Sequence, residues 1–288
     1  MYRSMLYVPA SSPRFIEKAG TRGADAIILD LEDSVAEEQK AAARKRLAEA
    51  VPFLSRSGTD VWVRVNRPLT LAVADVQAAT CAGAIGILLA KTEGPEHVRL
   101  IAEVADEEER HIGRVDGLKI IAVIETPAAV FRAREIAASD KRVIGMLAGA
   151  EDLATCMEAM PSAETLRMPK LLIHLAAKAA DRFSFGTLGT VADFADIGLI
   201  QKLAEEARRH GFDGATCIHP SVVPVLNQAF TPSQSDIDNA SGIIAAAKEA
   251  HAAGAGATTY KGKMIDEPVV ERAKRLVARA NFYRGTAS

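Results

Sequence analysis

The sequence predicts an α/β protein, a modified TIM (β/α)8 barrel followed by a C-terminal helical extension. Short apolar segments alternate with longer amphipathic ones about eight times, and the short segments are almost free of charge. Uncharged strands that are buried on both faces are typical of parallel sheets, and strict strand–helix alternation favours a closed barrel over an open sheet. The 288 residues accommodate one such barrel, which needs roughly 250 residues, and a short tail.

The expected elements of the barrel follow one another in order. Strands are predicted at residues 5–8, 26–31, 61–65, 85–89, 119–124, 143–147, 183–185 and 215–218. Helices are predicted at residues 15–21, 37–54, 71–81, 96–109, 128–138, 169–180 and 194–210. A dinucleotide-binding sheet is the alternative fold, but the first strand leads into Val-Pro-Ala-Ser-Ser-Pro and not into a glycine-rich turn.

The tail after the last predicted strand no longer alternates strands with helices. Residues 251–259 are small and glycine-rich, which predicts a flexible connector between two helices, the second at residues 267–281. We therefore expect residues 1–230 to form the catalytic barrel domain and residues 231–288 to form a C-terminal helical extension or lid.

The composition argues against several classes of partner. The 35 basic and 37 acidic residues give a net charge of −2, which predicts no surface for nucleic acid. No apolar stretch reaches membrane-spanning length and the first residues do not form a signal peptide, so we expect no membrane partner and a cytoplasmic location. The three cysteines match neither a zinc spacing nor a disulfide framework.

Polar residues gather where the expected strands end, which is where barrel enzymes place their chemistry. They are Asp30, Glu32, Asp33, Arg64, Lys91, Glu125, Glu151, Asp152 and His219. Carboxylates crowded at one rim repel each other unless a cation lies between them, and oxygen ligands without cysteine favour Mg²⁺, with Mn²⁺ as the alternative. Ordinary roles stay open, because acids after strands also cap helices, an arginine also forms internal ion pairs, and His219 also fits a packed structural position.

Ten motifs stand in the order found in one known family. They are RSMLYVP (residues 3–9), DLEDSV (30–35), Lys40 with Ala43 and Arg44, VRVN (63–66), LAK (89–91), IET (124–126), GAEDL (149–153), CIHP (217–220), AFTPS (229–233) and MID (264–266). On these residues the chain resembles the citrate lyase β-subunit family, the CoA-ester lyase group of the HpcH/HpaI aldolase superfamily. The resemblance runs from Arg3 to about Ala280.

The resemblance implies roles for particular residues. Glu125 and Asp152 would bind Mg²⁺, Glu32 and Asp33 would hold metal-bound waters, and Arg64 would bind a substrate carboxylate or carbonyl instead of serving as an internal ion-pair partner. Asp266 would lie near the site of a neighbouring subunit in a homotrimer or homohexamer, where it would transfer a proton. Its ordinary role is the N-cap of the last helix.

The implied substrates are small molecules, either acyl-CoA esters or keto acids. Members of the family cleave citryl-, citramalyl- or malyl-type CoA thioesters, and Arg3, Arg14 and Lys18 would contact the CoA phosphates at the mouth of the barrel. Loop residues that differ from the family pattern, such as Ala10 and Ala90, leave the acyl group and the use of CoA open. The rival functions are a class II pyruvate aldolase acting on free hydroxy-keto acids, an acyl-CoA thioesterase, and a non-catalytic subunit of a lyase.

Overall fold

A computed structural model describes the chain except for residues 191–193, 253, 255 and 286–288. The chain divides into two compact units, Met1–Phe230 and Thr231–Ser288. The connector expected at 251–259 includes residues 253 and 255, which lie outside the described residues.

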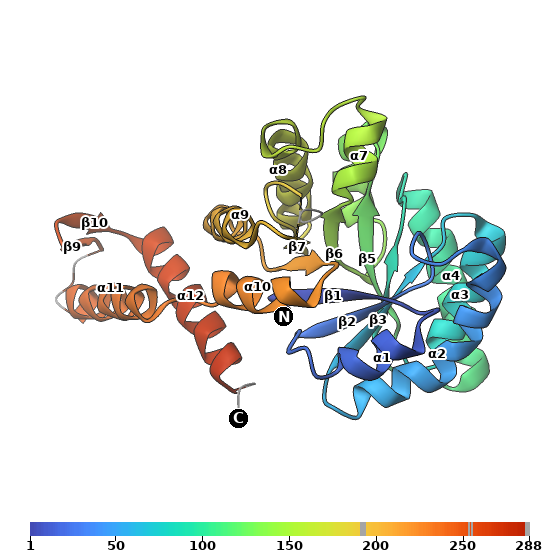
Figure 1. Ribbon diagram of the computed structural model, residues 1–288. Coiled ribbons are helices and arrows are strands. Elements are labelled where there is room, and N and C mark those ends of the chain that lie inside the picture. The colour runs from blue at the N-terminus through green and yellow to red at the C-terminus, as the bar shows by residue number, and fades with distance from the viewer. Residues whose placement is uncertain (191–193, 253, 255, 286–288) are drawn as a thin grey trace. The chain divides into compact units, whose positions relative to one another are not determined.

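The first unit is a barrel of parallel strands. The strands are β1 (Ser4–Pro9), β2 (Ala26–Asp30), β3 (Asp60–Val65), β4 (Gly86–Leu89), β5 (Lys119–Ile124), β6 (Val143–Ala148), β7 (Phe183–Phe185) and β8 (Ala215–Cys217). They pair in the order β7-β6-β5-β4-β3-β2-β1-β8. A parallel bridge between Phe185 and Gly214 joins the two ends of this order, with the Gly186 N–H donating to the Gly214 carbonyl at 2.8 Å. The predicted fold class is therefore confirmed (Figure 1).

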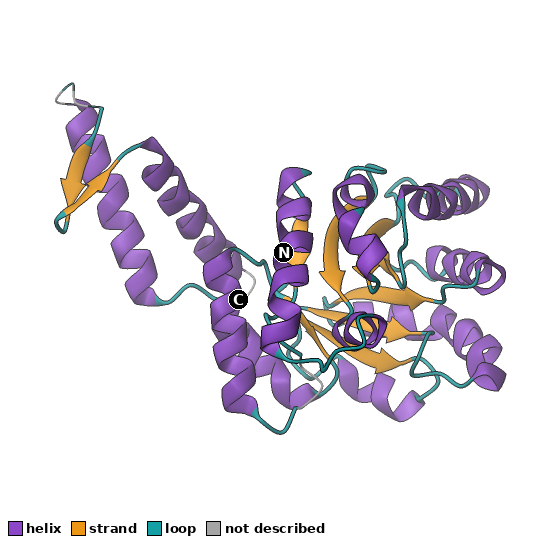
Figure 2. Cartoon of the chain, turned by 90° about the horizontal axis from the view of Figure 1, so that it is seen from above, coloured by secondary structure: helices purple, strands orange, loops and turns teal. Residues whose placement is uncertain are grey.

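Helices cover the outside of these strands (Figure 2). They are α1 (Pro13–Ala19), α2 (Lys40–Ser55), α3 (Leu69–Cys81), α4 (Pro95–Ile112), α5 (Pro127–Phe131), α6 (Ala133–Ala137), α7 (Ala150–Cys156), α8 (Ala163–Ala179), α9 (Ile197–His210) and α10 (Val223–Phe230), with 3-10 turns at Glu37–Gln39 and Pro220–Val222.

The helices α7 and α10 were not predicted, and two of the predicted helices differ in extent. The helix expected at 128–138 is divided at Arg132, whose φ of −98° and ψ of 4° leave the helical region. The helix expected to begin at residue 169 begins at Ala163, because Ser162 and Thr165 form a capping box that satisfies its first N–H groups. Pro169 lies inside this helix.

Side chains of the strands alternate between the inside and the outside of the barrel. The outward residues pack against the helices in one large cluster, whereas Met5, Ile28, Trp62, Ile121 and Phe185 belong to a separate cluster inside the strands. Trp62 has room there because its partner on β4 is Gly86, where a Cβ would lie 2.4 Å from the indole ring.

The second unit consists of two helices and a hairpin. Helix α11 (Gln234–Ala252) precedes β9 (Thr258–Tyr260) and β10 (Lys263–Ile265), which pair antiparallel, and α12 (Glu267–Gly285) follows. Lys261 and Gly262 both have positive φ, at 49° and 74°, as a two-residue hairpin turn requires. The sequence predicted a connector at residues 251–259 and no strands between it and the last helix.

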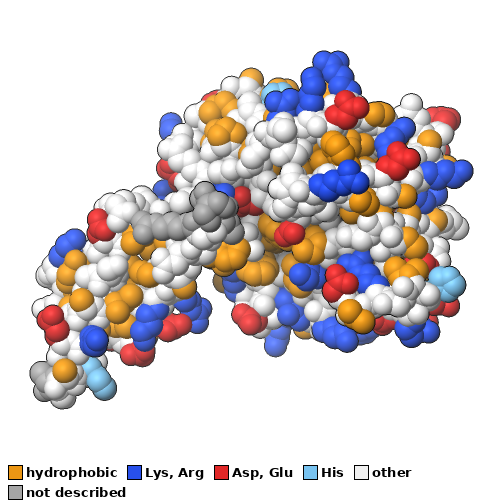
Figure 3. Space-filling view, turned by 90° about the horizontal axis from the view of Figure 1, so that it is seen from below, with side chains coloured by type: hydrophobic (Ala, Val, Ile, Leu, Met, Phe, Trp, Pro, Cys, Tyr) orange, Lys and Arg blue, Asp and Glu red, His pale blue; other side chains and the backbone are white. Residues whose placement is uncertain are grey.

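The surface drawn in Figure 3 carries acidic and basic side chains that are interspersed, in keeping with a net charge of −2. Among the described residues, no helix combines the length and the apolar character that crossing a membrane would require.

Candidate active site

A cavity of about 510 Å³ lies at the C-terminal ends of the strands. The walls of the cavity are formed by side chains that point into the barrel. These side chains are two residues apart along a strand, because neighbouring side chains of a strand point to opposite faces. The lining includes Tyr7, Asp30, Arg64, Val123, Glu125, Leu147, Gly149, Thr216 and Ile218 from the strands and their ends, with Asp33, Asp152, Lys170 and Thr190 from the loops and helices that follow. Of the nine strand-end residues named from the sequence, Asp30, Asp33, Arg64, Glu125, Glu151 and Asp152 line this cavity, whereas Glu32, Lys91 and His219 do not.

Arg64 and Asp30 form the central ion pair of the site. The two residues are register partners on β3 and β2, and the guanidinium binds both carboxylate oxygens, with Nε–Oδ1 and Nη2–Oδ2 distances of 2.7 Å. Burial would raise the pKa of Asp30, but the hydrogen bonds and charge of Arg64 hold it below its ordinary value. The expectation that Arg64 is not an internal ion-pair partner is therefore wrong, because adjacent inward positions on two strands bring the charges together.

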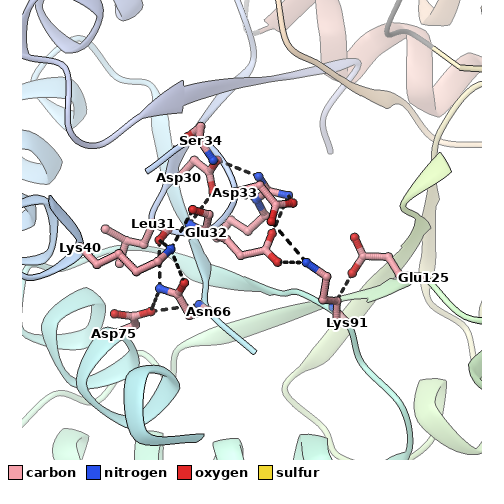
Figure 4. Close-up of polar contacts among 11 residues, drawn as sticks. Asp30, Leu31, Glu32, Asp33, Ser34, Lys40, Asn66, Asp75, Lys91 and Glu125 are labelled. Atoms are coloured by element: carbon pink, nitrogen blue, oxygen red, sulfur yellow. Dashed lines mark hydrogen bonds and ion pairs between the residues drawn. The ribbon is translucent and has the colours of Figure 1, made fainter. Parts of the chain in front are cut away.

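Glu32 and Asp33 extend this cluster toward Lys91 (Figure 4). The Arg64 Nη1 atom lies 2.8 Å from Glu32 Oε2 and 3.5 Å from Asp33 Oδ2. The Lys91 ammonium contacts Glu32 Oε1 and lies 3.3 Å from Asp33 Oδ1. Burial raises the pKa of Glu32, although both cations oppose the shift. Two acids and two cations thus face one another at the rim.

Among the described residues, no Lys or Arg side chain lies at ion-pair distance from the buried Glu125 carboxylate. Glu125 is 2% exposed, and its carboxylate accepts the backbone N–H of Lys91, a residue held at a φ of 48°. Burial raises its pKa to about 7, and the neighbouring charges of Glu32 and Asp152 add to the shift. Gly149 leaves space for this side chain, since a Cβ there would lie 2.4 Å from Glu125 Cγ.

Asp152 approaches the same cavity from the first turn of α7. Glu125 and Asp152 offer only oxygen ligands, which suits Mg²⁺. Within the described part of the chain, His, Cys, Asp and Glu side chains form no group of three or more that could hold a metal ion. The residues present therefore fit a cation that takes two protein carboxylates and completes its shell with other oxygens.

A second layer of buried polar groups holds the loop after β2, and the sequence analysis assigned it no role. The Lys40 ammonium donates to the Leu31 and Glu32 carbonyls and to Asn66 Oδ1, at 3.0, 2.9 and 2.7 Å (Figure 4). Asn66 donates in turn to Asp75, which is fully buried on α3. A lone acid on the apolar face of this helix was the signal that could have revealed the network.

Lys170 was also missed. It lies on the buried face of α8 with Leu166 and Ile173, and its ammonium donates to the carbonyls of Thr187, at 3.0 Å, and Gly189. Burial lowers its pKa to about 8. A single lysine on an apolar helical stripe was the available signal.

The proposed CoA contacts do not share one location. Arg3 precedes β1, so it lies at the N-terminal end of the barrel, where it pairs with Asp25 at 2.6 Å. Its expected place at the mouth is wrong, because the mouth lies at the other end of the strand. Arg14 and Lys18 are exposed on α1, which follows the C-terminal end of β1.

Two further residues have structural contacts. Asp266 belongs to the second unit, where its Oδ1 accepts the Val269 N–H at 3.4 Å in the first turn of α12. His219 stacks on Phe194 with ring centroids 4.4 Å apart, and its Nδ1 accepts the Ser221 N–H at 3.2 Å. The ordinary roles that the sequence left open for these residues are thus present.

Known proteins are similar to this chain in sequence and in fold. The family described as HpcH/HpaI aldolase/citrate lyase matches residues 3–220. The citrate lyase subunit beta of Haemophilus influenzae is 35% identical over 96% of each chain. A (3S)-malyl-CoA thioesterase of Cereibacter sphaeroides is 33% identical over 97% of this chain and 94% of its own. The structure of protein CitE from Mycobacterium tuberculosis, in complex with magnesium, acetoacetate and coenzyme A, superposes with a TM-score of 0.78, at 31% identity over 96% of this chain and 97% of that one.

The raised pKa of Glu125 predicts how the metal-free protein responds to pH. Its stabilising contribution is complete below the ordinary value of 4.5 and is lost as pH rises through about 7, because the folded state then holds an uncompensated buried anion. In chelator at pH 8, Glu125→Gln should therefore be more stable than wild type, by on the order of 3 kcal/mol. Denaturant unfolding between pH 4.5 and 8 measures the difference. The exposed Glu17→Gln serves as the control, and equal wild-type and Glu125→Gln curves at every pH would contradict the prediction.

Proposed function

The chain belongs to the HpcH/HpaI aldolase/citrate lyase family, and from that premise we propose a Mg²⁺-dependent carbon–carbon lyase that acts on a 3-hydroxyacyl-CoA thioester. The observation that carries this proposal is the single cavity that joins the Glu125–Asp152 carboxylates to the Arg64 guanidinium. Citryl-, citramalyl- and malyl-type esters are the substrates that we propose. The CitE complex with magnesium, acetoacetate and coenzyme A supports the metal and the thioester.

Glu125 and Asp152 are the residues that we propose hold the metal. When bound, Mg²⁺ would polarise the substrate's carbon–oxygen bonds and offset the repulsion between these carboxylates. Arg64 would bind a substrate oxygen through Nη1, which would then be shared with Glu32 at 2.8 Å, since its Nε and Nη2 atoms are held by Asp30. Glu32 and Asp33 would accept hydrogen bonds from water in the cavity. Arg14 and Lys18 would contact the CoA phosphates.

Cleavage then follows from proton movement. A carboxylate takes the proton of the 3-hydroxyl group, the bond between C2 and C3 breaks, and its electron pair passes to the thioester as an enolate while C3 becomes a keto group. We propose that Asp266 of a neighbouring chain, in a homotrimer or homohexamer, supplies this proton transfer. The support for its role is the family resemblance.

A thioesterase is the second candidate. The 33% identical relative named (3S)-malyl-CoA thioesterase favours it, because its chain matches over nearly its whole length. The two functions differ in product, since a thioesterase releases free CoA without any keto acid.

The proposed function predicts keto acid and a shorter acyl-CoA from one of these esters. A panel of citryl-, citramalyl- and malyl-CoA with Mg²⁺, read for both products by chromatography, is the measurement. Excess chelator should abolish the activity, and Mg²⁺ should restore it. Free CoA without keto acid would select the thioesterase. Turnover of free hydroxy-keto acids alone would select the aldolase, and full activity in chelator would contradict the metal.

Arg64 should not be replaceable by lysine. Lysine cannot bind both Asp30 oxygens and a substrate oxygen in one plane, so Arg64→Lys should lose about 100-fold in kcat/KM, nearly as much as Arg64→Ala. Circular dichroism must show that both variants are folded, because removing one member of a buried ion pair also destabilises the protein. Near-normal turnover by the lysine variant would reduce the role of Arg64 to charge alone.

The two roles of Asp266 can be separated by two substitutions. Asparagine caps a helix about as well as aspartate, so Asp266→Asn should keep stability and metal affinity while kcat falls roughly 10²- to 10⁴-fold. Asp266→Ala should lose about 1 kcal/mol of stability in addition. Mixing Asp266→Asn chains with Arg64→Ala chains should restore part of the activity if neighbouring chains share a site. Normal kcat in Asp266→Asn would leave only the cap.

A further inference from the structure

Tyr7 lies in the cavity next to the Arg64 guanidinium, and it is neither a proposed metal ligand nor a proposed contact of the substrate. It occupies an inward position of β1, two residues after Met5, which belongs to the cluster inside the barrel. The Arg64 Cζ atom lies 4.9 Å from the centre of the phenol ring. Val123 and Leu147, which face the same cavity, are apolar. Tyr7 therefore adds a phenol hydroxyl to the cavity, between the Arg64 guanidinium and these apolar side chains.

The Tyr7 hydroxyl has no partner within the described residues, and it is accessible. No hydrogen bond joins it to another described residue, and the oxygen is not among the fully buried polar atoms that lack a partner. Tyr7 itself lines the cavity, so the hydroxyl is open to this space. Tyr2, which precedes the N-terminal end of β1, shows the usual arrangement, since its hydroxyl donates to Asp60 at 2.7 Å.

The hydroxyl also keeps its proton. Burial raises the pKa of Tyr7 above its ordinary value, the charges of Asp30, Glu125 and Glu32 add to the shift, and Arg64 opposes it. The raised pKa favours the neutral phenol, which can donate a hydrogen bond. Its position beside Arg64 matters because Asp30 already holds two of the guanidinium nitrogens.

We propose that Tyr7 is a further catalytic residue, whose hydroxyl donates a hydrogen bond to the substrate oxygen that gains negative charge when the carbon–carbon bond breaks. This inference rests on the proposed lyase function. The 3-hydroxyl proton passes to a carboxylate, the C2–C3 electron pair moves into the thioester, and the thioester oxygen becomes an enolate oxygen. Tyr7 keeps its own proton throughout. A fixed donor aimed at developing charge stabilises the transition state more than the neutral ground state.

Tyr7→Phe tests this role, because it removes the hydroxyl and leaves the ring against Arg64. We expect kcat on the best CoA ester to fall about 100- to 1,000-fold, the usual effect of losing one such donor. KM and the thermal unfolding midpoint should stay close to wild type. The matched control is Tyr2→Phe, which removes a paired hydroxyl at the other end of the barrel and should lower the unfolding midpoint without changing kcat.

The possible results distinguish a failure of the role of Tyr7 from a failure of the proposed lyase function. A folded Tyr7→Phe enzyme with kcat within threefold of wild type would overturn the inference alone, and so would a change confined to KM. If the wild type instead hydrolyses the thioester, the same oxygen gains charge and the same loss of kcat is expected. A wild-type protein that transforms no CoA ester would overturn the proposed function and this inference together.

Discussion

The ion pair between Arg64 and Asp30 sets the geometry of the whole site. Asp30 is 1% exposed, and a buried carboxylate is tolerated only where its charge and lone pairs are satisfied. Arg64 binds both of its oxygens, and the same oxygens accept the Glu32 and Ser34 N–H groups at 2.9 and 3.2 Å. One carboxylate therefore orients both the guanidinium and the loop that carries Glu32 and Asp33.

The remaining charges are balanced unevenly around this pair. Glu32 and Asp33 face Arg64 and Lys91, so two cations oppose two acids. Glu125 receives a backbone N–H but, within the described part of the chain, no side-chain cation at ion-pair distance, and its pKa rises to about 7. A cation beside Glu125 would therefore be favourable, because it would offset the repulsion between this carboxylate and those of Glu32 and Asp152. Perturbed acids of this kind are common where a protein does chemistry.

The sequence was sufficient for the fold because its signals were local and repeated. Each strand was recognisable as an uncharged apolar segment, and the acids after β2, β5 and β6 had to lie at the same end once those strands were parallel members of one barrel. Contacts between distant residues had no such signal: Lys40 reaches Asn66 across 26 positions, and Arg64 reaches Asp30 across 34. Arg3 was placed at the wrong end of the barrel because only its closeness to β1 was considered. It precedes the strand, so it lies at the N-terminal end and not at the mouth. The hairpin of β9 and β10 was missed because its strands have only three residues each.

The glycine at the end of β6 shows how closely the two proposed metal ligands constrain the backbone. Glu125 leaves β5 and Asp152 enters from α7, so their side chains can share a cavity only if the chain between β6 and α7 passes close to Glu125. At Gly149 it passes so close that a Cβ would lie 2.4 Å from both Cγ and Oε1 of Glu125. Any larger residue there must displace that carboxylate, although the strand itself would tolerate a side chain. The glycine of the GAEDL segment is therefore required by the position of a neighbouring side chain, and its own φ of −76° is open to any residue.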